Sequence, residues 1–101
     1  MVSAWLAALS LAVADGVSPN AHALAVAESA LSYCAPLDPA AAEKIRRLIT
    51  QLAHGANEKQ LAELRSDDEY RKTYDSVVEF TGKIDPRNAK RFCAQASASR
   101  Q

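Results

Sequence analysis

The two cysteines, Cys34 and Cys93, are the residues whose chemistry is best defined by type and spacing. They are too far apart for a CxxC redox motif, and no cluster of Cys and His completes a zinc site. An even number of cysteines in a short chain is typical of a disulfide in an exported protein. The alternative is a pair of reduced core cysteines in a cytosolic protein. We expect a Cys34–Cys93 disulfide.

Other reactive side chains do not assemble into a catalytic pattern. His54 precedes Gly55 at an expected helix end, where a cation complements the helix dipole, and it is the one histidine that remains after the expected signal cleavage, so it is alone as a candidate base. Three consecutive acids, Asp67 to Glu69, point in different directions on a helix and suit its first turn better than a metal ion. The three glycines are isolated, so there is no phosphate-binding loop. We therefore expect no catalytic residue, metal or cofactor, and a protein that is not an enzyme.

Aromatic and basic side chains give a candidate surface for a protein partner. Tyr70 and Tyr74 are one helical turn apart, and amphipathic aromatic residues are common at interfaces. Half-buried tyrosines on a core face are the alternative. Basic residues of the last helix could form a patch with Lys44, Arg46 and Arg47 if the two helices are neighbours, or they could be a solvated face. The candidate partner surface is Tyr70, Tyr74, Arg87, Lys90 and Arg91.

The N-terminal part of the chain resembles a secretory signal in its pattern. Residues 4–14 form an uncharged apolar run, too short to span a bilayer but suited to a signal core. A small-x-small site follows at residues 21–23, so we expect a signal peptide at 1–23 and a single mature domain at 24–101. A second site, at residues 12–14, would make Asp15 the first mature residue. We expect no stable membrane insertion after cleavage.

One feature departs from the signal pattern. No Lys or Arg occurs before Lys44, whereas a signal peptide opens with basic residues. The alternative is that residues 3–14 form an ordinary buried helix of a cytosolic protein.

Composition and charge place the chain among single-domain helical proteins. It has 101 residues, with 12 Lys and Arg against 12 Asp and Glu, so its formal net charge is zero. This balance argues against nucleic acid as the main partner, because such proteins usually carry a basic excess. The apolar residues are rich in Ala and Leu, and no alternating strand pattern occurs. We expect an all-α fold, a small bundle of four to five short helices with its terminal helices joined by the disulfide.

Helix boundaries are marked by local signals. Pro36 ends the first helix, Asp38-Pro39 opens the second, and Gly55 closes it in a left-handed conformation. Asn57 with Gln60, and Ser66 with Glu69, predict capping boxes. Asp85-Pro86 opens the last helix. The expected apolar faces are Ala27, Ala30, Leu31 and Cys34; Ile45, Leu48, Ile49 and Leu52; Tyr70, Tyr74, Val77, Val78 and Thr81; and Ala89, Phe92, Cys93 and Ala96.

These features together predict a small exported helical protein that binds another protein in a bacterial-type envelope or outside the cell, hence periplasmic or secreted. One alternative is a periplasmic chaperone or an inhibitor of the immunity type, with a groove or apolar patch for its partner. Another is a cytosolic helical subunit with an uncleaved N-terminus. A groove lined by Tyr70, Tyr74 and Phe92 would favour binding, and a sealed interior would favour a structural role.

Overall fold

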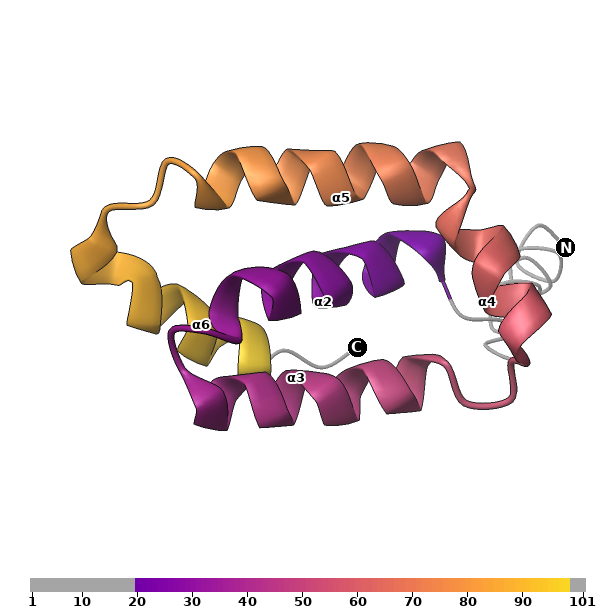
Figure 1. Ribbon diagram of the computed structural model, residues 1–101, viewed down its shortest axis with the longest axis horizontal. Coiled ribbons are helices and arrows are strands. Elements are labelled where there is room, and N and C mark those ends of the chain that lie inside the picture. Colours follow the sequence, from indigo (N-terminus) through magenta and orange to yellow (C-terminus); the bar gives the residue numbers. More distant parts are fainter. Residues whose placement is uncertain (1–19, 99–101) are drawn as a thin grey trace, which may run out of the picture.

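The computed structural model describes residues 20–98, which form an all-α bundle (Figure 1). The expected fold class is therefore confirmed. Residues 1–19, which hold most of the predicted signal peptide, and residues 99–101 lie outside the described part. Five α-helices and one 3₁₀ turn follow in the order α2 (Ala21–Cys34), α3 (Pro39–Leu52), α4 (Glu58–Arg65), α5 (Asp68–Thr81), η1 (Pro86–Asn88) and α6 (Ala89–Ala98).

Most helix ends lie where the local signals predict. The Asp38 carboxylate accepts the Ala41 amide at 3.1 Å, with Pro39 as the first residue of α3. Asn57 and Gln60 form the predicted reciprocal capping box, at 2.8 and 2.9 Å. Gly55 has a φ of +87°, which a residue with a Cβ rarely adopts. These ends depend on groups three or four residues apart, so sequence alone locates them.

Three helix starts differ from the prediction. The first helix was expected to begin at Leu24, but α2 begins at Ala21, because Asn20 caps it by accepting the Ala23 amide. The expected Ser66–Glu69 capping box is wrong: Ser66 ends α4, and Asp67 caps α5 by accepting the Glu69 amide at 2.7 Å. Asp85 is a cap as predicted, but it opens the 3₁₀ turn that precedes α6.

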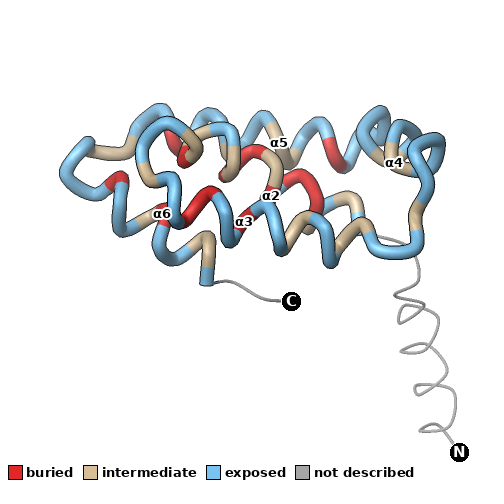
Figure 2. The backbone as a smooth tube through the Cα atoms, turned by 60° about the horizontal axis from the view of Figure 1, so that its bottom comes forward, coloured by how far each residue is buried: buried red, intermediate tan, exposed pale blue. Residues whose placement is uncertain are grey.

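Helix α2 is the centre of the molecule. It lies between α3 and α5, while α4 covers one end and α6 packs near the other (Figures 1 and 2). Small side chains make this possible, because alanine lets neighbouring helices approach closely. Buried residues therefore lie on several sides of α2, including Leu24 and Ala25, which the expected apolar face omitted. The described buried residues of α2 are Leu24, Ala25, Ala27, Ser29, Ala30 and Cys34.

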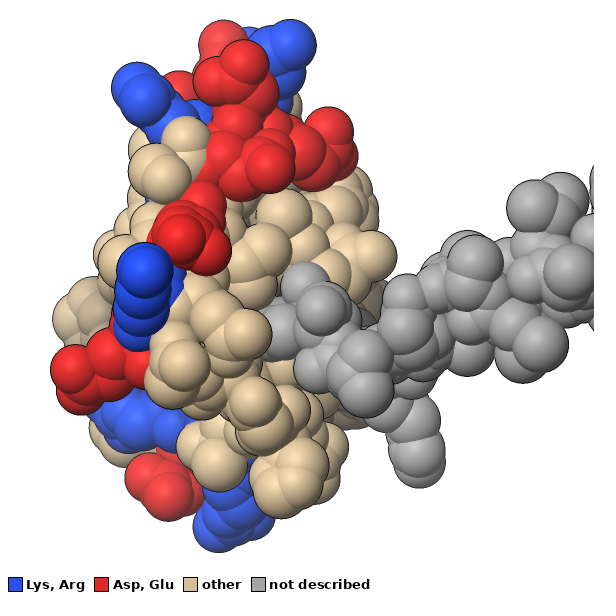
Figure 3. Space-filling view, turned by 90° about the vertical axis from the view of Figure 1, so that its right-hand side faces the viewer, with Lys and Arg blue, Asp and Glu red and all other residues tan. Residues whose placement is uncertain are grey.

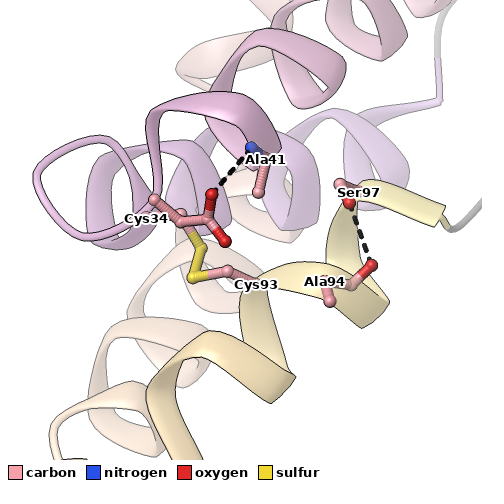
Figure 4. The surroundings of a disulfide bond; sticks show 6 residues. Cys34, Ala41, Cys93, Ala94 and Ser97 are labelled. Carbon is pink, nitrogen blue, oxygen red and sulfur yellow. Dashed lines mark hydrogen bonds between the residues drawn. A yellow bond between two sulfur atoms is a disulfide. The ribbon is translucent and has the colours of Figure 1, made fainter.

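The core has two clusters, one toward each end of α2. Near its C-terminus, Cys34 and Cys93 form the predicted disulfide between α2 and α6, with 5.8 Å between their Cα atoms (Figure 4). Both cysteines are fully buried, beside Ala30, Ala41 and Ile45. Near the N-terminus of α2, the second cluster is built on Leu24, Ala25 and Tyr70.

The predicted apolar faces are only partly buried, most clearly on α3 and α5. On α3, Ile45 is 1% exposed, whereas Leu48, Ile49 and Leu52 are intermediate. On α5, Tyr70 and Thr81 are buried, but Val78 is 50% exposed, so its assignment to the core face is wrong. The reason lies in the width of the contact, since α5 meets the core through a narrow stripe and Val78 lies outside it.

Candidate functional site

An apolar hollow lies between α2, α5 and α6. It has a volume of about 350 Å³ and is lined by Val26 of α2, Val77 and Phe80 of α5, and Phe92 of α6. The Phe80 ring contacts that of Phe92, with centroids 5.9 Å apart, yet 59% of Phe80 remains exposed. Large exposed apolar side chains around a hollow are typical of a binding surface.

Two further hollows continue this one. Toward α3, a hollow of about 260 Å³ shares His22 and Val26 with it and is also lined by Leu48 and Leu52. Toward the turn after α5, a hollow of about 620 Å³ shares Phe80 and Phe92 and adds Ile84. Neighbouring hollows share lining residues and so adjoin one another across the molecule. We call the three adjoining hollows together the apolar groove.

The groove remains open because α2 presents small side chains along part of its length. Ala23, Ala27 and Ala30 line it, and alanine leaves space that a leucine would fill. At the groove, α3 contributes Leu48 and Leu52, and α6 contributes Ala96. The helical spacing of apolar residues predicts Leu48 and Leu52 as core residues and leaves Phe80 outside the apolar face, so this groove is not evident from the sequence.

Positive charges border the apolar groove. Lys72, Lys83 and Arg91 belong to its lining, and within residues 20–98 none of them forms an ion pair. The acid among the described lining residues is Asp85, which Arg87 holds at 2.9 Å. The Arg87 guanidinium lowers the pKa of Asp85, which therefore stays ionised and paired. The unpaired charge at the groove is positive.

A polar cluster lies on another side of the molecule and joins three helices. Arg65 of α4 binds both oxygens of Glu28 on α2, through Nε at 3.0 Å and Nη2 at 2.6 Å. The Tyr70 hydroxyl of α5 donates to the same carboxylate at 2.5 Å. The Glu28 side chain is 17% exposed, so these bonds replace much of its contact with water.

The ionisation of this cluster suits a structural role. Burial raises the pKa of Glu28, but the hydrogen bonds from Arg65 and Tyr70 outweigh it, and the net pKa is lowered. Burial, and then the bond to Glu28, raise the pKa of Tyr70 well above its ordinary value. At neutral pH the carboxylate is therefore charged and the phenol protonated. The phenol is a hydrogen-bond donor here, and its oxygen is a poor base or nucleophile.

The structure separates the residues of the predicted partner surface. Tyr70 is 8% exposed and lies in the first turn of α5, with the half-buried Tyr74 ring 5.8 Å away. Arg87, Lys90 and Arg91 are exposed and follow the other end of α5, a helix of 14 residues and so about 21 Å long. Arg91 is the member of the set that lines the apolar groove. Helices α3 and α6 are neighbours, which is the arrangement that the larger basic patch requires.

The other polar residues singled out by the sequence lie at helix ends. Acidic side chains gather over the start of α5, where Asp67 caps the helix and Asp68 and Glu69 lie in its first turn (Figure 3). His54 is exposed just beyond the end of α3. Within residues 20–98, no group of three or more His, Cys, Asp or Glu side chains is arranged to hold a metal ion. In the same range, no helix has both the length and the hydrophobicity of a membrane span.

His22 was not singled out from the sequence. It lies on the exposed side of α2, with Nδ1 at 3.2 Å from the Thr73 hydroxyl and 3.5 Å from the Glu69 carboxylate. It also lines the apolar groove where two of the hollows meet. No local sequence signal indicates this contact, because it joins residues about fifty positions apart.

No protein-family model matches the chain, and neither a curated protein nor a solved structure is significantly similar to it.

Proposed function

We propose that this protein is an exported helical domain that binds another protein in the cell envelope or outside the cell, and that it acts by binding rather than by catalysis. The observation that carries the proposal is the apolar groove, with Phe80 exposed where two of its hollows adjoin. When a partner covers an exposed phenylalanine beside a hollow, apolar surface is removed from water and the complex is stabilised. The groove replaces Tyr70 and Tyr74 as the centre of the proposed surface.

Export is supported by the disulfide, since such bonds persist in oxidising compartments and are rare in the cytosol. The start of α2 bears on where a signal peptide would be removed. Cleavage after Ala23 would delete the Asn20 cap and place a positive amine at a helix N-terminus, which the dipole disfavours. Cleavage after Ala14 would keep the cap.

The mature protein is therefore expected to begin at Asp15. Intact mass of the protein from its native host distinguishes this form from one that begins at Leu24. A full-length protein recovered from the cytosol would contradict export altogether.

Site-specific photo-crosslinking tests the binding surface. A benzoylphenylalanine at position 80 in the native host is expected to form a discrete adduct with a partner protein. Position 78 is the matched control, because Val78 is also exposed on α5 but does not line the groove. Equal adducts at both positions, or none at position 80, would contradict the proposal.

A further inference from the structure

The way the groove is built limits how a partner can bind. Its described lining comes from four helices and the turn after α5, and helix backbone groups are already bonded within each helix. A partner therefore has no strand edge to extend and must bind through side chains. An amphipathic helix whose apolar stripe lies in the groove satisfies this condition.

The charged residues at the groove favour one class of amphipathic helix over others. Lys72 and Arg91 come from α5 and α6, and Lys83 from the turn between them, so cations border the groove from more than one element. The protein as a whole is neutral, with 12 basic and 12 acidic residues, so this excess belongs to the groove and not to the overall charge. Asp85 is held by Arg87 and offers little to an incoming cation.

We infer that the apolar groove binds an amphipathic helix of another protein, with Leu-like side chains on one face and Asp or Glu on the flanks of that face. The inference rests on the proposed function, to which it adds the chemistry of the partner. The apolar stripe covers Phe80 and Phe92, and the acidic flanks meet Lys72, Lys83 and Arg91. Complementary charges of this kind select the partner more than they add affinity.

Two designed peptides test the inference. Each is a fluorescently labelled helix of about 14 residues, or four turns. Both carry leucines at helical spacing, with glutamates on the flanks of one and lysines on the flanks of the other. Fluorescence anisotropy with the full protein is expected to show tighter binding of the acidic peptide by about tenfold, because three exposed ion pairs contribute a factor of about two each. Added salt should reduce the difference.

Variants of the protein test which residues are responsible for peptide binding and for its charge preference. Phe80→Ser should abolish binding of the acidic peptide, while Val78→Ser, the matched control, should not. Combined Lys72→Glu and Arg91→Glu should reverse the charge preference, whereas Lys44→Glu, at an exposed position on α3 outside the groove lining, should leave it unchanged. Circular dichroism checks that each variant remains folded.

The outcomes separate this inference from the proposed function. If both peptides bind equally well and Phe80→Ser abolishes both, the groove is a binding surface but its charge preference is refuted. If neither peptide binds and position 80 gives no cross-link in cells, both proposals fail. Phe80-dependent binding to anionic phospholipid vesicles, with no binding of the acidic peptide, would overturn a protein partner in favour of a membrane surface.

Discussion

Glu28 links three helices through one carboxylate. Its partners are 37 and 42 residues away in the sequence, so the cluster forms only when α4 and α5 are docked on α2. A half-buried carboxylate with a bidentate arginine and a phenol is well satisfied, and loss of its charge leaves the arginine without its counter-ion. The carboxylate thereby couples the ionisation of one residue to the packing of α2, α4 and α5.

The pH dependence of stability should report this coupling. Because the folded-state pKa of Glu28 is lowered, its contribution to stability is present above the unfolded pKa, near 4.5, and is lost as pH falls through the folded value. Glu28→Gln should lower the free energy of unfolding by about 1–2 kcal/mol at pH 7. The difference from the wild type should shrink below about pH 4.5.

Denaturant titrations of both proteins across this pH range measure the effect. Glu63→Gln is the control, since Glu63 is exposed and forms no ion pair within the described residues. A Glu28→Gln difference that is independent of pH would show that the side chain contributes by packing and not by its charge.

At the scale of elements, α3 shows how one apolar stripe serves two purposes. Ile45 lies in the core cluster around the disulfide, while Leu48 and Leu52 line the apolar groove. The stripe is continuous in sequence, but α2 and α6 cover only part of it. The remainder is available to a partner.

Alanine substitutions along α3 should reveal this division. Ile45→Ala should cost about 2–5 kcal/mol of unfolding free energy, because it opens a cavity in a site that is 1% exposed. Leu48→Ala should cost clearly less, because part of this side chain already faces the groove. Chemical denaturation of the two variants measures their free energies of unfolding. Equal losses of unfolding free energy would place Leu48 in a closed core.

At the scale of the whole molecule, the stability of the fold depends on the disulfide that joins α2 to α6. The disulfide joins residues 59 positions apart, and constraining a loop of this length in the unfolded chain stabilises the fold by about 4 kcal/mol in the chain-entropy account. A single small domain has a total stability of about 5–15 kcal/mol, so the bond is a large part of it. It also holds α6, whose Phe92 contacts Phe80 where two hollows of the groove adjoin.

Removal of the bond should therefore weaken both stability and binding. Cys34→Ala and Cys93→Ala should each lower the free energy of unfolding by about 2–5 kcal/mol. The double variant should be little worse than either single variant, because both changes remove one bond. Denaturation with and without reductant measures this. If reduction left the wild-type midpoint unchanged, the bond would contribute nothing to the fold.

Local sequence signals determine much of the secondary structure of this protein. The caps at Asp38 and Asn57, the left-handed Gly55 and the helical spacing of apolar residues each depend on neighbours within a few positions. The disulfide followed from the number of cysteines and their places on apolar faces. The all-α class and most helix boundaries could thus be predicted from sequence.

The site was decided by tertiary structure. Val78 and Phe80 are apolar, yet they remain exposed because they lie outside the stripe through which α5 contacts the core. Tyr70 was a candidate for a partner surface, but docking of α2 placed its hydroxyl on Glu28 and buried it. Which face of a helix is covered depends on contacts between residues tens of positions apart. Sequence periodicity identifies an apolar stripe, and the packing of neighbouring helices decides which part of that stripe remains free to bind.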